Sequence, residues 1–198
     1  PFENLGSADD VYFSDGITDE VRSKLSSLPQ LAVIARTSAM AYKGGTKSLQ
    51  TIAKELDVTY ILSGTVRWQK AAAGTSRIRV VPEFVEVSGA GAPVTRWQES
   101  FDAVLEDVFR VQSEIADRVA GALNITLGAR EQRLMAGRPT SSLAAYDAYL
   151  RGEKLWFEAG SDVAELQKAV GQYEQAVSLD PGFAVAWVVT VRSLPPAW

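Results

Sequence analysis

The sequence predicts an α+β protein: an α/β sandwich, with helices packed on a mixed sheet that contains an antiparallel meander, followed by an all-α helical hairpin. Three observations favour this class. Apolar residues alternate with polar ones between residues 60 and 101, which is typical of strands with one solvated face. Apolar residues recur with helical spacing in 48–56 and 105–125, and from Ser142 onward the pattern is purely helical.

The first 35 residues predict a loop, a helix and a buried strand. Residues 1–16 read as a loop. A helix is expected to open at Gly16 with acidic residues in its first turn and to close at Pro29, with Val21, Leu25 and Leu28 as its buried stripe. The short apolar run 31–35 then predicts a buried strand.

The middle of the chain predicts a loop over 36–47, a helix capped by Ser48, and three consecutive strands. The strands start near Asp57, near Arg77 and at Val94, and turns at 71–74 and 88–93 join them. Pro82 cannot donate a ladder hydrogen bond, and the apolar parity shifts after it. An edge position or a one-residue bulge is therefore expected at Pro82.

The last part of the chain predicts helices only. One helix covers 105–125, and residues 126–141 are expected to form a linker with a short helical turn around 130–135. Three further helices are expected over 142–159, over 163–179 and from Phe183 to the prolines at 195–196. This gives an amino-terminal domain of residues 1–125 and a helical region of residues 142–198.

Composition excludes several kinds of chemistry. The chain has 198 residues, a net charge of −4, no cysteine and no histidine. Disulfides, thiolate chemistry and histidine general bases are therefore absent. An acidic chain with no run of basic residues does not suit nucleic acid, and no apolar stretch is long enough to insert into a membrane. No cofactor or catalytic residue is predicted.

Because the sequence opens on Pro1-Phe2, we expect a piece of a longer protein whose preceding residues form a strand.

The helical region resembles a tetratricopeptide (TPR) repeat. Ala169, Tyr173 and Ala176 lie on one helix face, and Asp180-Pro181-Gly182 stops that helix. The residues that match the repeat pattern are Gly152, Ala169, Tyr173, Ala176, Pro181 and Trp187. The sequence departs from the pattern in a longer turn near Gly160 and at Thr190-Val191. The resemblance implies one full repeat and part of a second.

Residues 1–125 resemble the TolB amino-terminal-domain family, which is also seen in FlgO-like proteins. The matching segments are 1–5, 12–20, 33–38, 42–44, 53–60, 64–67 and 107–112. A TolB-like domain joined to TPR helices resembles the carboxy-terminal part of bacterial Ser/Thr kinase, adenylate cyclase or winged-helix signalling proteins. The resemblance implies a periplasmic or extracytoplasmic position on a membrane-anchored parent, with a cytoplasmic position as the alternative.

Two candidate sites follow from the residues. Arg36, Ser38, Tyr42 and Lys43 follow the expected buried strand, and such strand ends often hold ligands, so they could bind an anion. The alternative is a loop tied to the sheet edge. In the helical region, Tyr146, Tyr149 and Trp156 could contact a protein or peptide partner, although most aromatic residues there should form the core.

Other clusters favour ordinary structure over chemistry. Asp9, Asp10 and Asp15 with the acidic residues that follow do not match a calcium loop, so no metal site is predicted. Residues 44–48 lack the full phosphate-loop pattern. The carboxylates of Glu83, Glu86 and Glu99 are expected on solvated strand faces.

The leading hypothesis is a non-catalytic interaction and sensory module of a larger signalling protein, which binds a protein or peptide. The parent chain would carry the catalytic domain. The alternatives are an assembly platform that acts as a homodimer and a small-ligand-binding domain that takes an anion.

Overall fold

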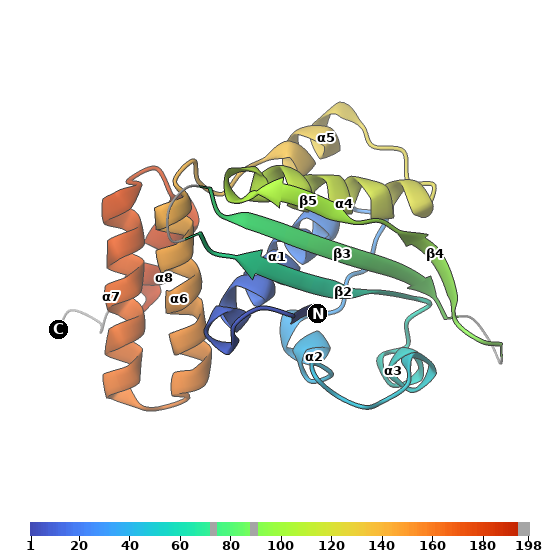
Figure 1. Ribbon diagram of the computed structural model, residues 1–198, viewed down its shortest axis with the longest axis horizontal. Coiled ribbons are helices and arrows are strands. Elements are labelled where there is room, and N and C mark those ends of the chain that lie inside the picture. The colour runs from blue at the N-terminus through green and yellow to red at the C-terminus, as the bar shows by residue number, and fades with distance from the viewer. Residues whose placement is uncertain (72–74, 88–90, 194–198) are drawn as a thin grey trace. The chain divides into compact units, whose positions relative to one another are not determined.

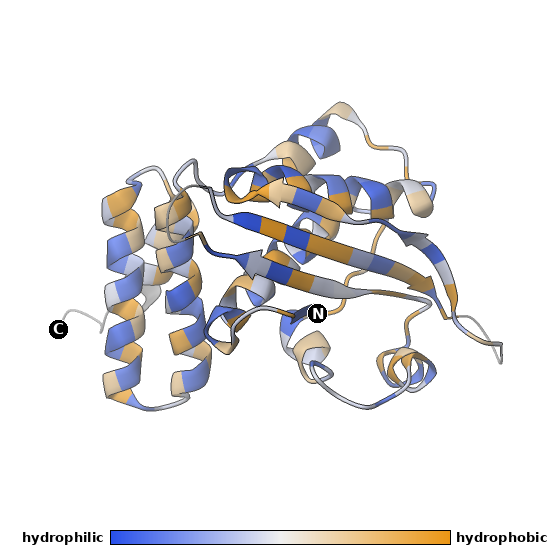
Figure 2. Cartoon of the chain, viewed as in Figure 1, coloured by the Kyte–Doolittle hydropathy of each residue, from blue (hydrophilic) through white to orange (hydrophobic). Residues whose placement is uncertain are grey.

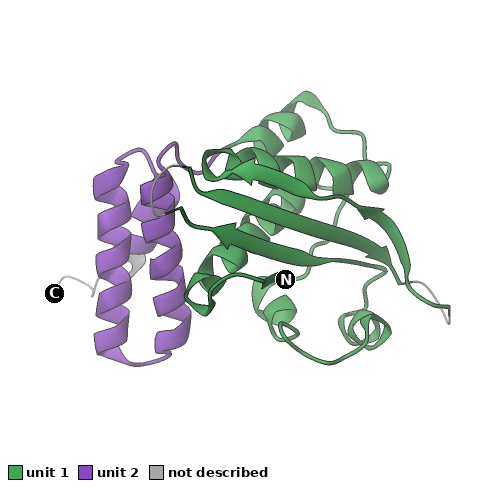
Figure 3. Cartoon of the chain, in the orientation of Figure 1, with its two compact units in different colours: residues 1–137 green, residues 138–198 purple. Residues whose placement is uncertain are grey.

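The computed structural model describes residues 1–71, 75–87 and 91–193, and Figure 1 shows its elements. These residues form two compact units, residues 1–137 and 138–198, which Figure 3 distinguishes. Unit 1 combines helices with a mixed sheet, as the α+β prediction required. The described part of unit 2 is helical. None of the described helices has the length and apolar character needed to cross a bilayer.

The sheet of unit 1 has five strands in the described residues. The short strand β1 (Phe2–Asn4) runs parallel to β2 (Tyr60–Gln69). Antiparallel neighbours follow in the order β2, β3 (Arg77–Glu86) and β4 (Val94–Gln98), so the predicted meander is confirmed. The fifth strand, β5 (Phe101–Val104), pairs with the other end of β3. The expected third strand 94–101 is thus divided at 99–100.

The bulge predicted at Pro82 occurs two residues later, where the register between β3 and β4 shifts between Phe84 and Val85. Pro82 itself pairs with Gly64 of β2 and is flanked on its other side by the break between β4 and β5. The missing N–H of proline is tolerated at such an interruption. A side chain at Gly64 would lie 2.4 Å from the Val81 carbonyl oxygen, so only glycine allows this close approach.

One face of the sheet packs against two helices that lie behind it in Figure 1. These are α1 (Val11–Ser26) and α4 (Val108–Ala122), which follows the 3-10 turn η2 (Leu105–Asp107). Val66, Ile78 and Val80 are buried on this face, and Phe13 of α1 contacts Trp68 with ring centroids 4.4 Å apart. Residues that alternate with them are polar, as the hydrophilic bands of β2 and β3 in Figure 2 show.

The first 35 residues differ from the prediction. The helix α1 begins at Val11, after a 3-10 turn η1 (Ala8–Asp10), rather than at Gly16. Residues 1–16 therefore contain a strand and a helix start. Residues 31–35 are not a strand and are only partly buried. An extended segment needs a neighbouring strand to complete its hydrogen bonds, and the space beside this segment is a cavity.

Two short helices follow. Residues 36–40, expected as loop, form α2 (Arg36–Met40). The helix predicted after Ser48 is confirmed as α3 (Leu49–Leu56), and the Ser48 hydroxyl accepts the Thr51 N–H as an N-cap. Ala53 of this helix packs with Val85 and Val87. Val85 is therefore buried under α3 although it directly follows the buried Phe84.

The expected linker 126–141 is largely part of unit 1. Helix α5 (Ala129–Ala136) packs against α4 and buries Met135. Two side chains hold its end: the Lys24 ammonium donates to the carbonyl oxygens of Met135 at 2.8 Å and Gly137 at 2.6 Å, and the Ser113 hydroxyl donates to the Met135 carbonyl at 2.8 Å. Residues 130–135 were correctly predicted as helical, but they form a packed helix.

Unit 2 contains α6 (Leu143–Ala159), α7 (Val163–Leu179) and α8 (Ala184–Ser193), close to the predicted bounds. Ser142 caps α6 and Asp162 caps α7. The predicted turns at 72–74 and 88–90 and the helix end at 195–196 lie outside the described residues.

Candidate functional site

Unit 1 contains a cavity of about 580 Å³ beside the edge of its sheet. Three extended segments border it: residues 1–3, residues 31–34 and the start of β2. Strand β1 pairs only with Gly64–Val66, so within the described chain no strand lies on that side of Tyr60–Ser63. The wall of the cavity is mostly apolar, and Val21 and Leu25 of α1 contribute to it. This is the concave apolar setting in which ligands or extended segments bind.

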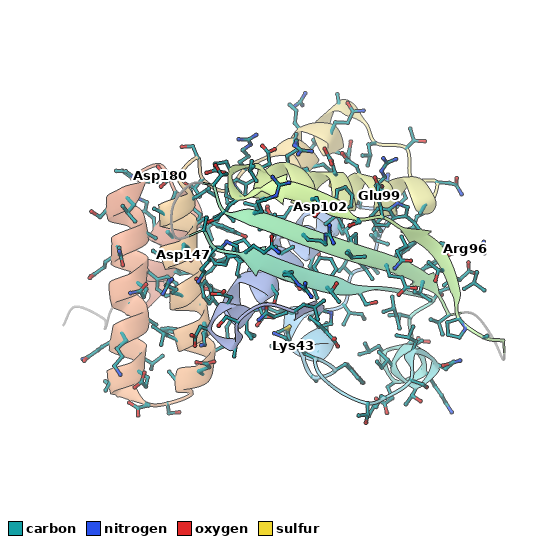
Figure 4. All side chains as sticks on the ribbon, in the orientation of Figure 1. Lys43, Arg96, Glu99, Asp102, Asp147 and Asp180 are labelled. Carbon is teal, nitrogen blue, oxygen red and sulfur yellow. The ribbon has the colours of Figure 1, made fainter. Side chains whose placement is uncertain are left out.

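The four residues predicted to bind an anion lie on and after α2; Tyr42 and Lys43 line this cavity, whereas Arg36 and Ser38 are not in its lining. Figure 4 labels Lys43 in this region. Arg36 pairs with Asp19 at 2.6 Å between Nε and Oδ2, and Lys43 pairs with Asp15. The Tyr42 hydroxyl donates to Glu55 at 2.7 Å. An anion would have to displace these carboxylates from their cations. Ser38 is exposed.

The acidic residues of α1 and the turn before it are also paired. Asp10 pairs with Lys70, and Glu20 lies 3.4 Å from Lys24. Burial raises the pKa of Asp19, and the nearby Arg36 and Arg22 guanidinium groups oppose that rise. Burial likewise raises the pKa of Glu20, against the effect of Lys24. In the described part of the chain no group of three or more acidic residues could hold a metal ion.

The three glutamates expected on strand faces each contact a different residue. Glu83 accepts a hydrogen bond from Thr95, Glu86 pairs with Arg96, and Glu99, labelled in Figure 4, lies 3.2 Å from Arg118. Each of these carboxylates therefore has a hydrogen-bond or ion-pair partner of its own.

Unit 2 places the three predicted partner-binding residues in different surroundings. Tyr146 is buried, and Tyr149 contacts the rings of Tyr173 and Phe183 at centroid distances of 6.0 and 5.2 Å. Tyr149 is half-buried, and Trp156, with 37% of its surface exposed, is the most accessible of the three. The spacing of the aromatic residues along the helix did not show which of them would be buried in the core and which would be exposed.

Several apolar residues of unit 2 are exposed, and of these only Trp156 was predicted as a partner-binding residue. They lie near the turn between α6 and α7 and around the end of α7 and the outer side of α8. We call them the apolar rim: Trp156, Phe157, Val163, Leu179, Val185, Trp187 and Val188. The signal in the sequence was the excess of apolar residues over those needed for one stripe on each helix.

The buried Lys24 of α1 was also not predicted, because lysine is seldom fully buried.

The chain was compared with known proteins. No family model matches the chain. Over 189 residues the chain is 35% identical to a protein of Rhizobium meliloti (strain 1021) named "Putative adenylate cyclase 3". The alignment covers 94% of the chain and 30% of that protein. The chain thus resembles a part of a much longer protein whose name refers to adenylate cyclase signalling.

Proposed function

We propose that this chain is a non-catalytic interaction and sensory module of a larger bacterial signalling protein that carries an adenylate cyclase. Unit 1 would be its TolB-like domain and unit 2 its TPR-like region. The module would bind a protein or peptide and pass that state to the attached catalytic domain. The relative named as an adenylate cyclase supports this context, because the chain aligns with only 30% of its length.

The observation that carries the proposal is the apolar rim of unit 2. Core positions between the helices are filled by other residues, among them Ala169, Tyr173 and Phe183. The rim residues expose apolar surface to solvent at the two ends of α7. Exposed apolar surface can mark a protein interaction site. Large aromatic residues such as Trp156 and Trp187 commonly dominate the binding energy at such sites.

The charged side chains of unit 1 support a binding role over catalysis. Lys43 and Lys47, which line the cavity, are paired with Asp15 and Glu55, and the chain has no histidine or cysteine. The proposal also places the module on the extracytoplasmic side of a membrane-anchored parent. Reporter fusions to the full-length protein would test that position.

A hybrid cyclase tests the proposal. The matching segment of the Rhizobium meliloti protein is replaced by this chain, and cyclic AMP is measured in cells. The double variant Trp156→Ser/Trp187→Ser should change the cyclic AMP level relative to the unmodified hybrid. The control Gln167→Ser/Glu174→Ser alters exposed residues of α7 and should not. Synthesis of cyclic AMP by residues 1–198 alone, or equal levels in both double variants, would contradict the proposal.

A second candidate function is self-assembly. Val185 and Val188 lie on one side of α8 and are 45% and 55% exposed, so a second copy could cover them. Light scattering at high protein concentration distinguishes the two functions. A dimer that Val188→Glu dissociates would favour an assembly platform, whereas a monomer would favour binding of another protein.

A further inference from the structure

The side of the sheet that faces away from α1 and α4 carries a concentration of positive charge. Arg67 of β2 and Arg77 and Arg79 of β3 are all exposed there. We call these three residues the arginine face. They alternate with Val66, Ile78 and Val80, which are buried on the helix-covered side. No helix lies in front of the half of β3 that pairs with β5 in Figure 1, so this part of the face is open in unit 1, whereas α3 covers the same side further along β3, at Val85.

The arrangement is unfavourable for the sheet itself. Arg67 and Arg79 are directly opposite each other in the antiparallel register. Like charges in such a cross-strand pair are destabilising. Asp102 of β5, labelled in Figure 4, pairs with Arg79 at 2.7 Å. Arg67 and Arg77 make no ion pair with any other residue that the structure describes.

Two of the guanidinium groups match the repeat of an extended chain, and the third lies beside them on the neighbouring strand. Arg77 and Arg79 are two residues apart on one strand, so their α-carbons are separated by about 6.7 Å. Arg67 adds a third group across the strand pair, at an α-carbon distance of about 5 Å. In an extended peptide, side chains that point the same way are also two residues apart. Carboxylates at alternate positions would therefore meet successive guanidinium groups, which bind carboxylates through paired hydrogen bonds.

We propose that the arginine face binds an extended acidic segment of a partner protein, with Asp or Glu at alternate positions. Charge complementarity selects this partner, since the face carries three positive charges and one negative charge on a chain of net charge −4. The patch is too small and the chain too acidic for a nucleic-acid footprint. This surface belongs to unit 1 and is distinct from the apolar rim, so the proposal goes beyond the function proposed above.

Fluorescence anisotropy with residues 1–198 tests the proposal. The probe is a short labelled peptide in which Glu alternates with Thr, and a second peptide of the same composition has its glutamates in one block. The alternating peptide should bind more tightly than the block peptide, and its affinity should fall when salt is added. The variant Arg67→Gln/Arg77→Gln should lower its affinity about tenfold.

A charge-matched control separates the site from general attraction. Arg130→Gln/Arg133→Gln removes two exposed arginines of α5 and should leave the affinity within about twofold. Thermal melting checks that both variants fold. Equal binding by the two double variants, or no binding of the alternating peptide, would overturn the proposal. A single-stranded oligonucleotide or phosphatidylserine vesicles that bind through Arg67 and Arg77 in place of the peptide would overturn it as well.

Discussion

Gly152 of α6 lies directly against the ring of Tyr173 of α7. A β-carbon at position 152 would be 2.6 Å from Cε1 of Tyr173, and the ring is buried. The Tyr173 hydroxyl continues past the glycine and donates to Glu153 at 2.9 Å. The absence of a side chain at one position thus lets a large side chain fill the space between the two helices.

Gly152→Ala should destabilise unit 2 by about 1–3 kcal/mol, because the added methyl group forces the Tyr173 ring out of its place. Chemical denaturation followed by circular dichroism measures the change. Gly171→Ala is the control: it lies on α7 with open space around it and should stabilise the helix by about 0.5–1 kcal/mol. Equal effects of the two substitutions would contradict this account of the helix contact.

Lys24→Met should destabilise unit 1 by about 3 kcal/mol, because it leaves the carbonyl groups of Met135 and Gly137 without their charged donor. Hydrogen exchange should increase in α5. Lys54→Met, an exposed change on α3, should have little effect. If both variants are equally stable, the buried ammonium does not hold the end of α5.

The stability of unit 2 should depend on Asp180 in acid. Hydrogen bonds from the Thr140 hydroxyl and from the Gly182 N–H lower the pKa of Asp180 below its ordinary value of 3.8. This carboxylate therefore contributes stability above pH 3.8, and the contribution is lost as the pH falls through the lowered pKa. Asp180→Asn should be less stable than the wild type at neutral pH, and the difference should narrow in acid.

Thr140→Val removes the side-chain donor and should reproduce much of the Asp180→Asn behaviour. Asp9→Asn changes an exposed residue of the 3-10 turn and serves as the control. Denaturation curves over a range of pH measure the three variants. A constant difference between Asp180→Asn and the wild type at every pH would contradict the assignment.

The cavity of unit 1 predicts the effect of an amino-terminal extension. In the parallel register, Phe2 pairs with Gly64, so residues placed before Pro1 would run beside Tyr60–Leu62. Four strand-forming apolar residues added there should fill the cavity, raise the melting temperature by several degrees and reduce binding of a hydrophobic dye. An extension of Gly-Ser-Gly-Ser should do neither. Equal melting temperatures for the two extensions would contradict this use of the cavity.

Sequence reasoning predicted well those elements whose pattern of apolar and polar residues, or whose capping residue, depends on their immediate surroundings. Strands β2 and β3 bury alternate residues, such as Val66, Ile78 and Val80, against α1 and α4, and the arginines between them are exposed. The caps Ser48, Ser142 and Asp162 mark helix starts through local hydrogen bonds. Such signals do not depend on distant parts of the chain.

The elements that were mispredicted depend on distant neighbours. Residues 31–35 have the composition of a buried strand but lie beside a cavity, and composition cannot supply the missing partner. The start of α1 was placed too late because the acidic residues that follow Gly16 suggested the first turn of a helix. In the candidate site, no local pattern showed that Asp15 and Asp19 would pair with Lys43 and Arg36.

Helix α1 contacts two separate features of unit 1, the cavity and the end of α5. Val21 and Leu25 line the cavity, whereas Lys24 of the same helix holds the carbonyl groups of 135 and 137, where unit 1 ends. A rigid helix cannot shift on one side only. An occupant that displaced α1 would therefore have to stretch or break the hydrogen bonds from Lys24 to the end of α5.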